Sequence, residues 1–444
     1  MRLNYARTFL IGCAFLGLQV LFAIYNAYLP LFLQAGREDF TMTTPLDGGF
    51  GLGAGVTGFI MSLENLAALL ILPFIGALSD TTASPLGRRK PYLLVGVPIT
   101  ALAFVTLPFL IGGPLWLFML VTLVFVVFVD VIRTPIIALM PDVTPSALRS
   151  QANGVINLMG GLGAVLAFAI GGRLFGFAVT GPFIFGGLAL LVGCALVIWL
   201  VPTPSSVDLP RPSGGLSGVV RAALYDEQNG LLANIAAVRR EGGGATLWLL
   251  AAILCLFLNF SALTVFFTSF ATDTLRVPRG EEALLLAWFS LAIVVCALPA
   301  GIVGARLGRR SSMLLGALIM ATALIITGFS SDLTLIRPLL VLAGAGWSLI
   351  VVNALPMVLD CAPQDGIERV GAYTGIYFIA TQSAEVLGPT LLGGLLDLTG
   401  RDFRLIFAYA AAALLLGAAL LLRVRSGEAV VVSGGIQESG FRSQ

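Results

Sequence analysis

Long apolar stretches alternate with short polar breaks along almost the whole chain. A hydrocarbon core about 30 Å thick is crossed by a helix of about 20 apolar residues. The breaks are marked by Gly, Pro or clustered charges, as at Gly112-Gly113-Pro114 and Thr180-Gly181-Pro182. The pattern predicts an all-α membrane protein with twelve transmembrane helices, at 8–33, 55–79, 91–113, 115–140, 150–172, 180–201, 246–271, 282–303, 312–330, 335–359, 370–396 and 404–422.

The longest polar break divides these helices into two sets of six. We expect an N-terminal six-helix bundle at 1–201, a cytoplasmic central loop at 202–245 and a C-terminal six-helix bundle at 246–425, followed by a disordered cytoplasmic tail at 426–444. Within the central loop, the apolar spacing at 216–238 fits an amphipathic helix on the membrane surface and equally a plain linker.

Basic residues predict the orientation of the helices. The first window is too long for the apolar part of a signal peptide and lacks a small-residue cleavage site, so it is interpreted as an uncleaved span. Seventeen Lys and Arg residues then fall on the side of the termini and seven on the other side, with Arg133 inside a span. Both termini are therefore predicted to be cytoplasmic.

The composition excludes several classes of protein. Of the 444 residues, 58% are hydrophobic, 11% are charged and none is histidine, whereas about 25% of a soluble domain is charged. A soluble enzyme, a disordered chain and a nucleic-acid-binding protein do not fit these figures. The five cysteines lie in or beside apolar runs without C-x-x-C spacing, so we expect buried thiols, no metal and no cofactor.

Polar loop motifs recur in the two halves of the chain. Gly76 and Asp80, followed by Gly87-Arg88-Arg89-Lys90, come after the second window, and Gly301 to Gly304, followed by Arg306 and Gly308-Arg309-Arg310, come after the eighth. Asp142 and Arg149 after the fourth window recur as Asp360 and Arg369 after the tenth. Two similar halves are typical of transporters in which one half moves against the other.

These motifs carry a family resemblance over nearly the whole chain. The loop Gly76-x-x-x-Asp80 with Gly87-Arg88-Arg89-Lys90 resembles that of the major facilitator superfamily. The long Asp-to-Gly spacing and the Arg-Arg-Lys-Pro ending are similar to the sucrose–proton symporters and to the related glycoside–pentoside–hexuronide cation symporters. The segment from Ala138 to Asp142 resembles the same branch. The resemblance implies a twelve-helix secondary transporter.

Two departures bear on coupling and direction. Sodium-coupled members of the second group carry paired aspartates before a proline in span two, where this chain has Leu72 and Ala68 before Pro73. This favours proton coupling or no coupling. Drug–proton antiporters of the superfamily carry Gly-Pro followed by Gly-Gly in span five. Here span five has no proline, although Gly388-Pro389 occurs in span eleven, so the exclusion of an exporter is incomplete.

The first loop motif has a physical interpretation of its own. Asp80 lies close in sequence to Arg88, Arg89 and Lys90, and a carboxylate there can pair with these cations or with a helix N-terminus. The motif is then a latch that closes in one conformational state, the alternative being a set of cations that only anchors the topology. We expect a weaker second copy, because Ala305 stands near the acidic position. The predicted cytoplasmic gate comprises Gly76, Asp80, Gly87, Arg88, Arg89, Lys90, Asp142, Arg149, Arg309 and Arg310.

Four charged residues are predicted at membrane depth: Glu64, Asp130, Arg133 and Glu385. A charge inside the membrane costs at least about 2.5–3.5 kcal/mol, so these side chains should line a cavity. Asp130 and Arg133 share one helical face. They form either a structural ion pair or a proton site beside a substrate-binding arginine. Glu64, Asp130 and Glu385 are the candidates for proton coupling, the alternative being neutral acids that only join helices.

Neutral polar and aromatic side chains in the same spans provide the groups that bind a sugar, through hydrogen bonds and ring stacking. With Arg133, the substrate-binding candidates are Asn26, Tyr25, Asn157, Asn259, Asn353, Gln382 and Trp347, and Gln19, Tyr373 and Tyr377 are of the same kind. Each of them taken alone is more often a contact between helices or part of the interfacial aromatic belt.

We therefore expect a secondary transporter of the cell or inner membrane that takes up a sugar or glycoside with protons by alternating access. Its expected partners are the small-molecule substrate, protons and membrane lipid, without nucleic acid, and we expect a monomer. Two other functions stay open. One is proton-driven efflux of a small metabolite or drug, and the other is a non-transporting sensor or scaffold, which has no need of deep charges. An enzyme is not expected, because no nucleophile–base pair or metal-ligand cluster is visible.

Overall fold

Long α-helices follow one another along the chain, and the described residues contain no strand. The computed structural model describes residues 4–145, 148–203, 243–361 and 370–424. The helices are α1 (Tyr5–Gln34), α2 (Ala54–Asp80), α3 (Lys90–Thr106), α4 (Leu115–Val143), α5 (Arg149–Phe177), α6 (Gly181–Leu200), α9 (Gly243–Asp273), α10 (Glu281–Leu307), α11 (Arg309–Phe329), α12 (Leu333–Asp360), α13 (Val370–Leu398) and α14 (Leu405–Leu421). The predicted all-helical class is confirmed. The predictions for 216–238 and for the tail at 426–444 lie outside the described residues.

One helix falls in each predicted window, and the third window differs most. It was expected to span 91–113, but α3 ends at Thr106 and a short 3-10 helix, η1 (Leu107–Leu110), follows. Pro108 has no backbone N–H with which to continue the α-helical hydrogen bonds, so the chain tightens there.

The helices have the length and surface of membrane spans. Ten of the described helices are long and apolar enough to cross a membrane, and α14, with 17 residues, is a shorter apolar helix. In α13, Gln382, Ser383 and Glu385 near the middle lower the mean hydropathy. Large apolar side chains lie exposed at the helix surfaces, Trp116, Phe177, Trp199 and Phe329 among them. Lipid is the solvent that suits such a surface.

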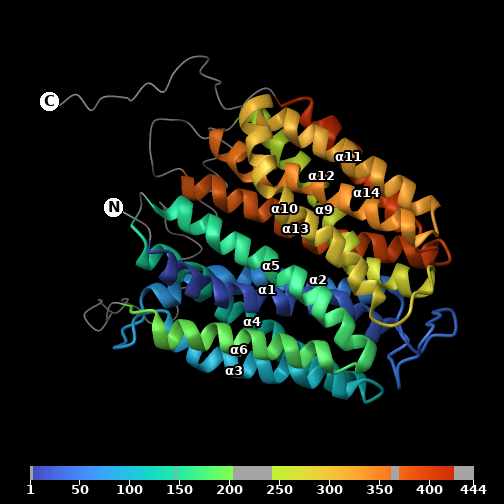
Figure 1. Cartoon of the computed structure of the whole chain (residues 1–444), viewed down its shortest axis with the longest axis horizontal. Coiled ribbons are helices and arrows are strands. Elements are labelled where there is room, and N and C mark those ends of the chain that lie inside the picture. The colour runs from blue at the N-terminus through green and yellow to red at the C-terminus, as the bar shows by residue number, and fades with distance from the viewer. Residues whose placement is uncertain (1–3, 146–147, 204–242, 362–369, 425–444) are drawn as a thin grey trace.

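Helices from the same half of the chain pack together. Figure 1 shows the blue-to-green helices α1–α6 on one side and the yellow-to-red helices α9–α14 on the other. In the first half α1 packs against α5 and α6, and α3 against α4 and α6. In the second half α12 packs against α10 and α11, and α14 against α9 and α11. The helices alternate in direction. We call the end where α1 begins and α14 ends the termini end, and the opposite end, where α1 ends and α2 begins, the far end.

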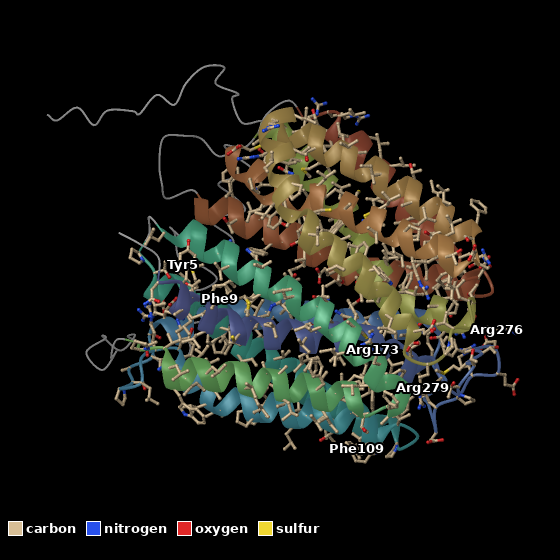
Figure 2. All side chains as sticks on the ribbon, in the orientation of Figure 1. Tyr5, Phe9, Phe109, Arg173, Arg276 and Arg279 are labelled. Carbon is tan, nitrogen blue, oxygen red and sulfur yellow. The ribbon has the colours of Figure 1, made fainter. Side chains whose placement is uncertain are left out.

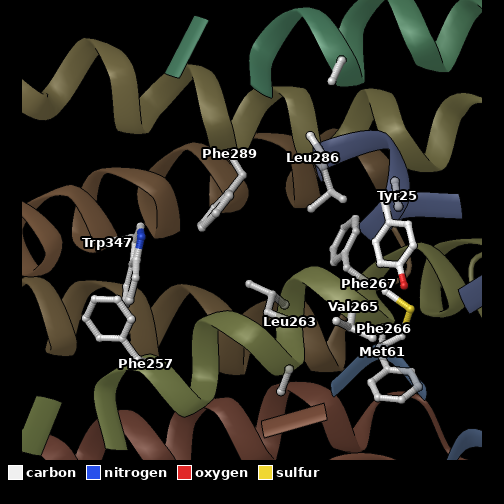
Figure 3. Close-up of a cluster of buried hydrophobic side chains, with 14 of the residues drawn as sticks. Tyr25, Met61, Phe257, Leu263, Val265, Phe266, Phe267, Leu286, Phe289 and Trp347 are labelled. Atoms are coloured by element: carbon white, nitrogen blue, oxygen red, sulfur yellow. The ribbon is translucent and has the colours of Figure 1, made fainter. Parts of the chain in front are cut away.

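Contacts between the two halves run along three helix pairs, α2–α13, α5–α10 and α1–α9. Glycine permits the closest of these approaches, since a Cβ added at Gly58 of α2 would stand 2.2 Å from the Pro389 carbonyl oxygen of α13. Toward the far end the halves also share an apolar core. Figure 3 shows Tyr25 and Met61 of the first half beside Phe266 and Phe267 of α9, all four buried.

We predict that Gly280→Ala destabilises the protein more than Gly400→Ala. Both glycines have a positive φ, +97° and +74°, which costs an alanine about 1–2 kcal/mol. A Cβ at Gly280 would also stand 2.2 Å from the Gly172 carbonyl oxygen, whereas one at Gly400 meets nothing within 4 Å. The clash adds about 1–3 kcal/mol. Thermal unfolding of the purified variants in detergent measures the difference, and equal Tm values would contradict the contact between α5 and α10.

Candidate functional site

The deep charged residues lie on α2, α4 and α13, near the middle of each helix. Glu64 is 4% exposed and Asp130 is fully buried. The Glu64 carboxyl is within electrostatic range of Asp130, Arg133 and Glu385. Three helices from both halves therefore bring the four residues singled out in the sequence into one electrostatically linked group, which we call the deep charge group.

Arg133 is the only cation in the deep charge group. Its Nη1 lies 4.0 Å from Asp130 Oδ1, and its guanidinium carbon lies 5.1 Å from the centre of the Phe22 ring on α1. The i,i+3 spacing on α4 sets the first contact, and the second is a cation–π contact. Neither Asp130 oxygen has a hydrogen-bond partner among the described residues. At this separation the pair is a long ion pair, which leaves Asp130 without the donors that usually satisfy a buried carboxylate.

The predicted substrate-binding residues lie in different surroundings. The Asn353 amide nitrogen donates to Ser312 Oγ (3.1 Å) and to the Leu349 and Ala300 carbonyl oxygens, 2.9 and 3.4 Å away. Asn259, also buried, donates 2.7 Å to the Leu256 carbonyl oxygen of its own helix. These bonds favour the interpretation that both asparagines join or stabilise helices.

Other predicted residues stay near the deep charge group or are more exposed. The Gln382 amide nitrogen is buried without a partner among the described residues and lies one turn from Glu385 on α13. Tyr25 packs on Phe125 with ring centres 5.0 Å apart and is within electrostatic range of Glu64. Asn26 is half-buried and Asn157 on α5 is exposed.

In the second half, a cluster of aromatic side chains lies on α9, α12 and α13. Trp347 of α12 stacks on Phe260 of α9, with ring centres 4.5 Å apart and planes 5° apart, and meets Phe257 edge-on at 4.9 Å. Tyr377 of α13 also meets Phe257 edge-on, at 6.2 Å. Figure 3 shows Trp347 and Phe257 side by side. The first half thus supplies most of the charge, and both halves supply aromatic rings.

The first loop motif ties three helices of one half together. Arg88 forms a fork to Asp142, with Nε–Oδ2 and Nη2–Oδ1 distances of 3.1 and 2.5 Å, and Arg89 Nε lies 2.9 Å from Asp142 Oδ2. Arg89 also donates to Asp80 and Ser79. The ends of α2 and α4 and the start of α3 are therefore joined by charge-assisted hydrogen bonds, within the first half.

The last cation of the motif has a different role. Lys90 is buried, and its Nζ donates 2.8 Å to the Ile198 carbonyl oxygen near the end of α6. Arg310 does the same in the second half, where Nε and Nη2 donate to the Leu421 and Leu422 carbonyl oxygens at 3.0 and 2.5 Å. Cations favour helix C-termini, whose carbonyl groups lack intrahelical donors. Both residues therefore bind the end of a neighbouring helix of their own half.

The second loop motif keeps part of the network. Arg309 pairs with Asp360, which corresponds to Asp142 in the repeat. Gly87 and Gly308, which precede the arginines in the two motifs, both have positive φ, +83° and +89°. Gly76 faces Thr134, 3.5 Å from the Cβ it would carry. The side chain of Arg149, where α5 begins, lies outside the described residues.

Contacts at the far end join the halves, and the sequence did not single them out. Figure 2 shows Arg173, Arg276 and Arg279 at this end, with Tyr5 at the opposite one. The Arg276 carbonyl oxygen accepts from Thr43 Oγ1 at 2.8 Å. Arg401, Asp397 and Asp39 form ion pairs there, beside a hollow of about 280 Å³. Asp39 and Arg401 are 362 residues apart, so their pairing could not be predicted from local sequence. The pairing of Asp397 with Arg401 could be, because the two residues are only four apart in the sequence.

No group of three Asp, Glu or Cys side chains that could hold a metal ion occurs among the described residues. The deep charge group and its neighbours offer carboxyl, guanidinium, amide and aromatic groups. Such groups can bind a polar solute and exchange protons with it.

Solved transporters share this fold. The nucleoside transporter NupG has a TM-score of 0.69 at 12% sequence identity, over 94% of this chain and 100% of that one. The peptide transporter POT in complex with sulfate has a TM-score of 0.70 at 13% identity, over 95% of each chain. At these identities the likeness concerns the fold, which is that of a helical, multi-pass membrane transporter.

The family model of the Major Facilitator Superfamily matches residues 8–287 and 249–441. The chain belongs to this superfamily, which confirms the resemblance seen in the loop motifs. It is 33% identical over 69 residues to Sucrose transport protein SUT1 of Oryza sativa subsp. japonica, a match spanning 16% of this chain and 13% of that protein. It is 25% identical over 343 residues to Tetracycline resistance protein, class B, of Escherichia coli, spanning 75% and 77%.

We predict that Asp142→Asn destabilises the protein more than Asp360→Asn, its counterpart in the repeat. Asp142 accepts from two arginines and its side chain is 15% exposed, so its loss should cost about 2–3 kcal/mol. Asp360 has one arginine partner and its side chain is 36% exposed, and such a pair contributes about 0.2–1 kcal/mol. Thermal unfolding in detergent compares the two. A greater loss for Asp360→Asn would overturn the assignment of Asp142 as the centre of the network.

Proposed function

We propose that this protein is a proton-coupled transporter that takes up a sugar or glycoside by alternating access across the cell or inner membrane. The two halves, 1–201 and 246–425, are the six-helix bundles that move against each other, joined by the central loop, with both termini in the cytoplasm. The observation that carries the proposal is the deep charge group, because ionisable residues at membrane depth are costly and typically mark the path of a substrate or of protons.

The carboxyls of the deep charge group are the proposed proton carriers. Glu64 and Glu385 come from opposite halves and are within electrostatic range of each other. A change in the charge of one therefore alters the energy of the contact between the halves. That is the physical requirement for coupling protonation to a conformational equilibrium.

Substrate recognition is assigned to side chains of the deep charge group and of α1, α12 and α13. Arg133, Gln382 and Asn26 supply hydrogen-bonding groups, and Tyr25 and Trp347 supply aromatic faces. A sugar presents hydroxyl groups and an apolar ring face, which such a mixture suits. Supporting this class are the Asp80 to Tyr92 segment and the short match to a sucrose transport protein.

The conformation fits one state of this cycle. Among the described residues, hydrogen bonds and ion pairs join the two halves at the far end. Others join α2 to α13 in the part of that contact closest to the far end. At the termini end, ion pairs between described residues stay within one half. With the termini in the cytoplasm, the far end faces outward, and the structure represents a state closed to the outside.

A second candidate function is proton-driven efflux. The observation that favours it is the length of the match. The tetracycline resistance protein matches 75% of this chain, whereas the sucrose transport protein matches only 16%. In proteoliposomes with an imposed pH gradient, the direction of proton movement that accompanies substrate distinguishes symport from antiport. Protons moving against the substrate would replace uptake by efflux.

We predict that Glu64→Gln abolishes proton-driven uptake but spares exchange of substrate across the membrane. Glutamine keeps the size of a protonated glutamate and cannot release a proton. A panel of sugars and glycosides is first screened by thermal shift on the purified protein, and ligands that bind are tested in proteoliposomes for gradient-driven uptake and for counterflow.

Glu38→Gln is the matched control, because it makes the same change in an exposed loop. It should leave both activities unchanged. Uptake by Glu64→Gln at the level of the unmodified protein would remove Glu64 from the mechanism. A complete lack of binding and uptake across the sugars would overturn the substrate class.

A further inference from the structure

A network of ion pairs lies at the far end, and one of its pairs, Asp39 with Arg401, joins the two halves. Arg401, which follows α13, places Nη1 3.1 Å from Asp39 Oδ1 and Nη2 3.1 Å from Asp397 Oδ1. Asp39 belongs to the loop between α1 and α2, and Arg37 of the same loop binds it at 2.7 Å. The Arg401 side chain is 9% exposed, so this guanidinium is shielded while it bridges two carboxylates.

Asp397 also closes the start of α2. Its Oδ1 accepts from the Ala54 N–H at 3.0 Å, and its Oδ2 accepts from the Gly55 N–H at 2.7 Å. The first N–H groups of a helix have no partners within the helix, and a carboxylate there also meets the positive end of the helix dipole. The N-cap residue of α2 is Gly53, which has no side chain, and the first turn contains no acidic residue. The cap of α2 is therefore supplied by the other half.

Glycines around this cap leave room for the Asp397 carboxylate. A Cβ at Gly53 or Gly55 would stand 2.9 or 2.8 Å from Asp397 Oδ2, and a Cβ at Gly393 would stand 2.3 Å from the Ala54 carbonyl oxygen. Larger residues at any of the three would push α13 away from α2. Glycine on both helices thus gives Asp397 its access to the two N–H groups.

We propose that Asp39, Asp397 and Arg401 form a clasp that closes the far face, and that Asp397 is a positioning residue for α2, the helix that bears Glu64. The proposal rests on the proposed function in one respect, namely that the halves separate at this face during transport. On separation α2 loses its cap and Arg401 loses Asp39, so the clasp biases the equilibrium toward the closed far face.

Asp39 of the clasp stays charged in mild acid. The Arg37 hydrogen bonds hold the pKa of Asp39 below its usual value of 3.8, and Arg401 acts in the same direction. Glu38 is its neighbour in the sequence, Asp273 interacts with it electrostatically, and Asp397 shares Arg401 with it. Because the pKa is lowered, the contribution of Asp39 is complete above pH 3.8 and is lost only as the pH falls through the lowered value. A proton gradient with a mildly acidic outer side therefore leaves Asp39 charged.

Hydrogen–deuterium exchange of the full-length protein in nanodiscs, without substrate, tests the clasp directly. In Asp397→Ala, we expect exchange in the first turn of α2 to rise by about 2- to 30-fold, the range that corresponds to replacing a capping side chain by alanine. We expect slower exchange in the loop at 81–89, because opening of the far face closes the termini end. Glu38→Gln, in the same loop as Asp39 but without an ion pair among the described residues, should match the unmodified protein.

Three outcomes would overturn the proposal. Unchanged exchange at the first turn of α2 would show that Asp397 does not control it. Faster exchange at both ends of α2 would show a general loosening, which a merely structural contact produces. The milder Asp39→Asn retains the cap and should raise exchange at the loop 37–53 while leaving the Tm within about 2 °C, as expected for an exposed ion pair in a chain of this size. Unchanged exchange at this loop in Asp39→Asn would be the third outcome that overturns the proposal. Since the experiment needs no substrate or proton gradient, its result is separate from that of the transport assay.

Discussion

The cost of keeping ionisable groups away from water dominates the architecture of this protein. Glu64, Asp130, Arg133 and Glu385 lie near the middle of long apolar helices, where each charge must meet a partner or line a cavity. Because of this cost, α2, α4 and α13 turn these residues inward. In contrast α3, α6, α11 and α14 carry no charge in their central turns, pack mainly against helices of their own half and present apolar side chains outward. Charge in the central turns thus occurs only on helices that turn it inward, although inner helices such as α1 and α9 carry none.

Charge has different roles at the two ends of the helices. At the termini end Asp142 holds Arg88 and Arg89, while Lys90 and Arg310 bind the ends of α6 and α14, always within one half. Such bonds tie the helices of each half to one another. At the far end the Asp39–Arg401 pair crosses between the halves. The latch interpretation of the first motif therefore needs another conformation, since the pairs in this one join helices of the same half.

The helices were predictable from the sequence because membrane thickness requires about 20 apolar residues per span and polar breaks separate them. The deep charge group was predictable for the same reason: a charge in such a run stands out. What could not be predicted depends on pairing across the chain. Nothing near Asp39 indicates Arg401, and nothing near Asn353 shows that Ser312 and Ala300 will accept its hydrogen bonds. Lys90 was grouped with the gate because a sequence shows the charge of a loop but not the carbonyl groups of the helix beside it.

The α2–α13 contact connects the deep charge group to the far face. Glu64 and Glu385 are within electrostatic range of each other. Ser62, half a turn from Glu64, hydrogen-bonds the Val386 carbonyl oxygen at 2.7 Å and lies 2.7 Å from Thr390 Oγ1, and Gly58 touches Pro389 one turn further on. Asp397 then caps α2 at its start. Since these contacts follow one another along two rigid helices, a shift of α2 against α13 at Glu64 cannot occur without altering the cap. Under the proposed function, a change in protonation at the deep charge group is thus transmitted to the clasp by the helix pair itself.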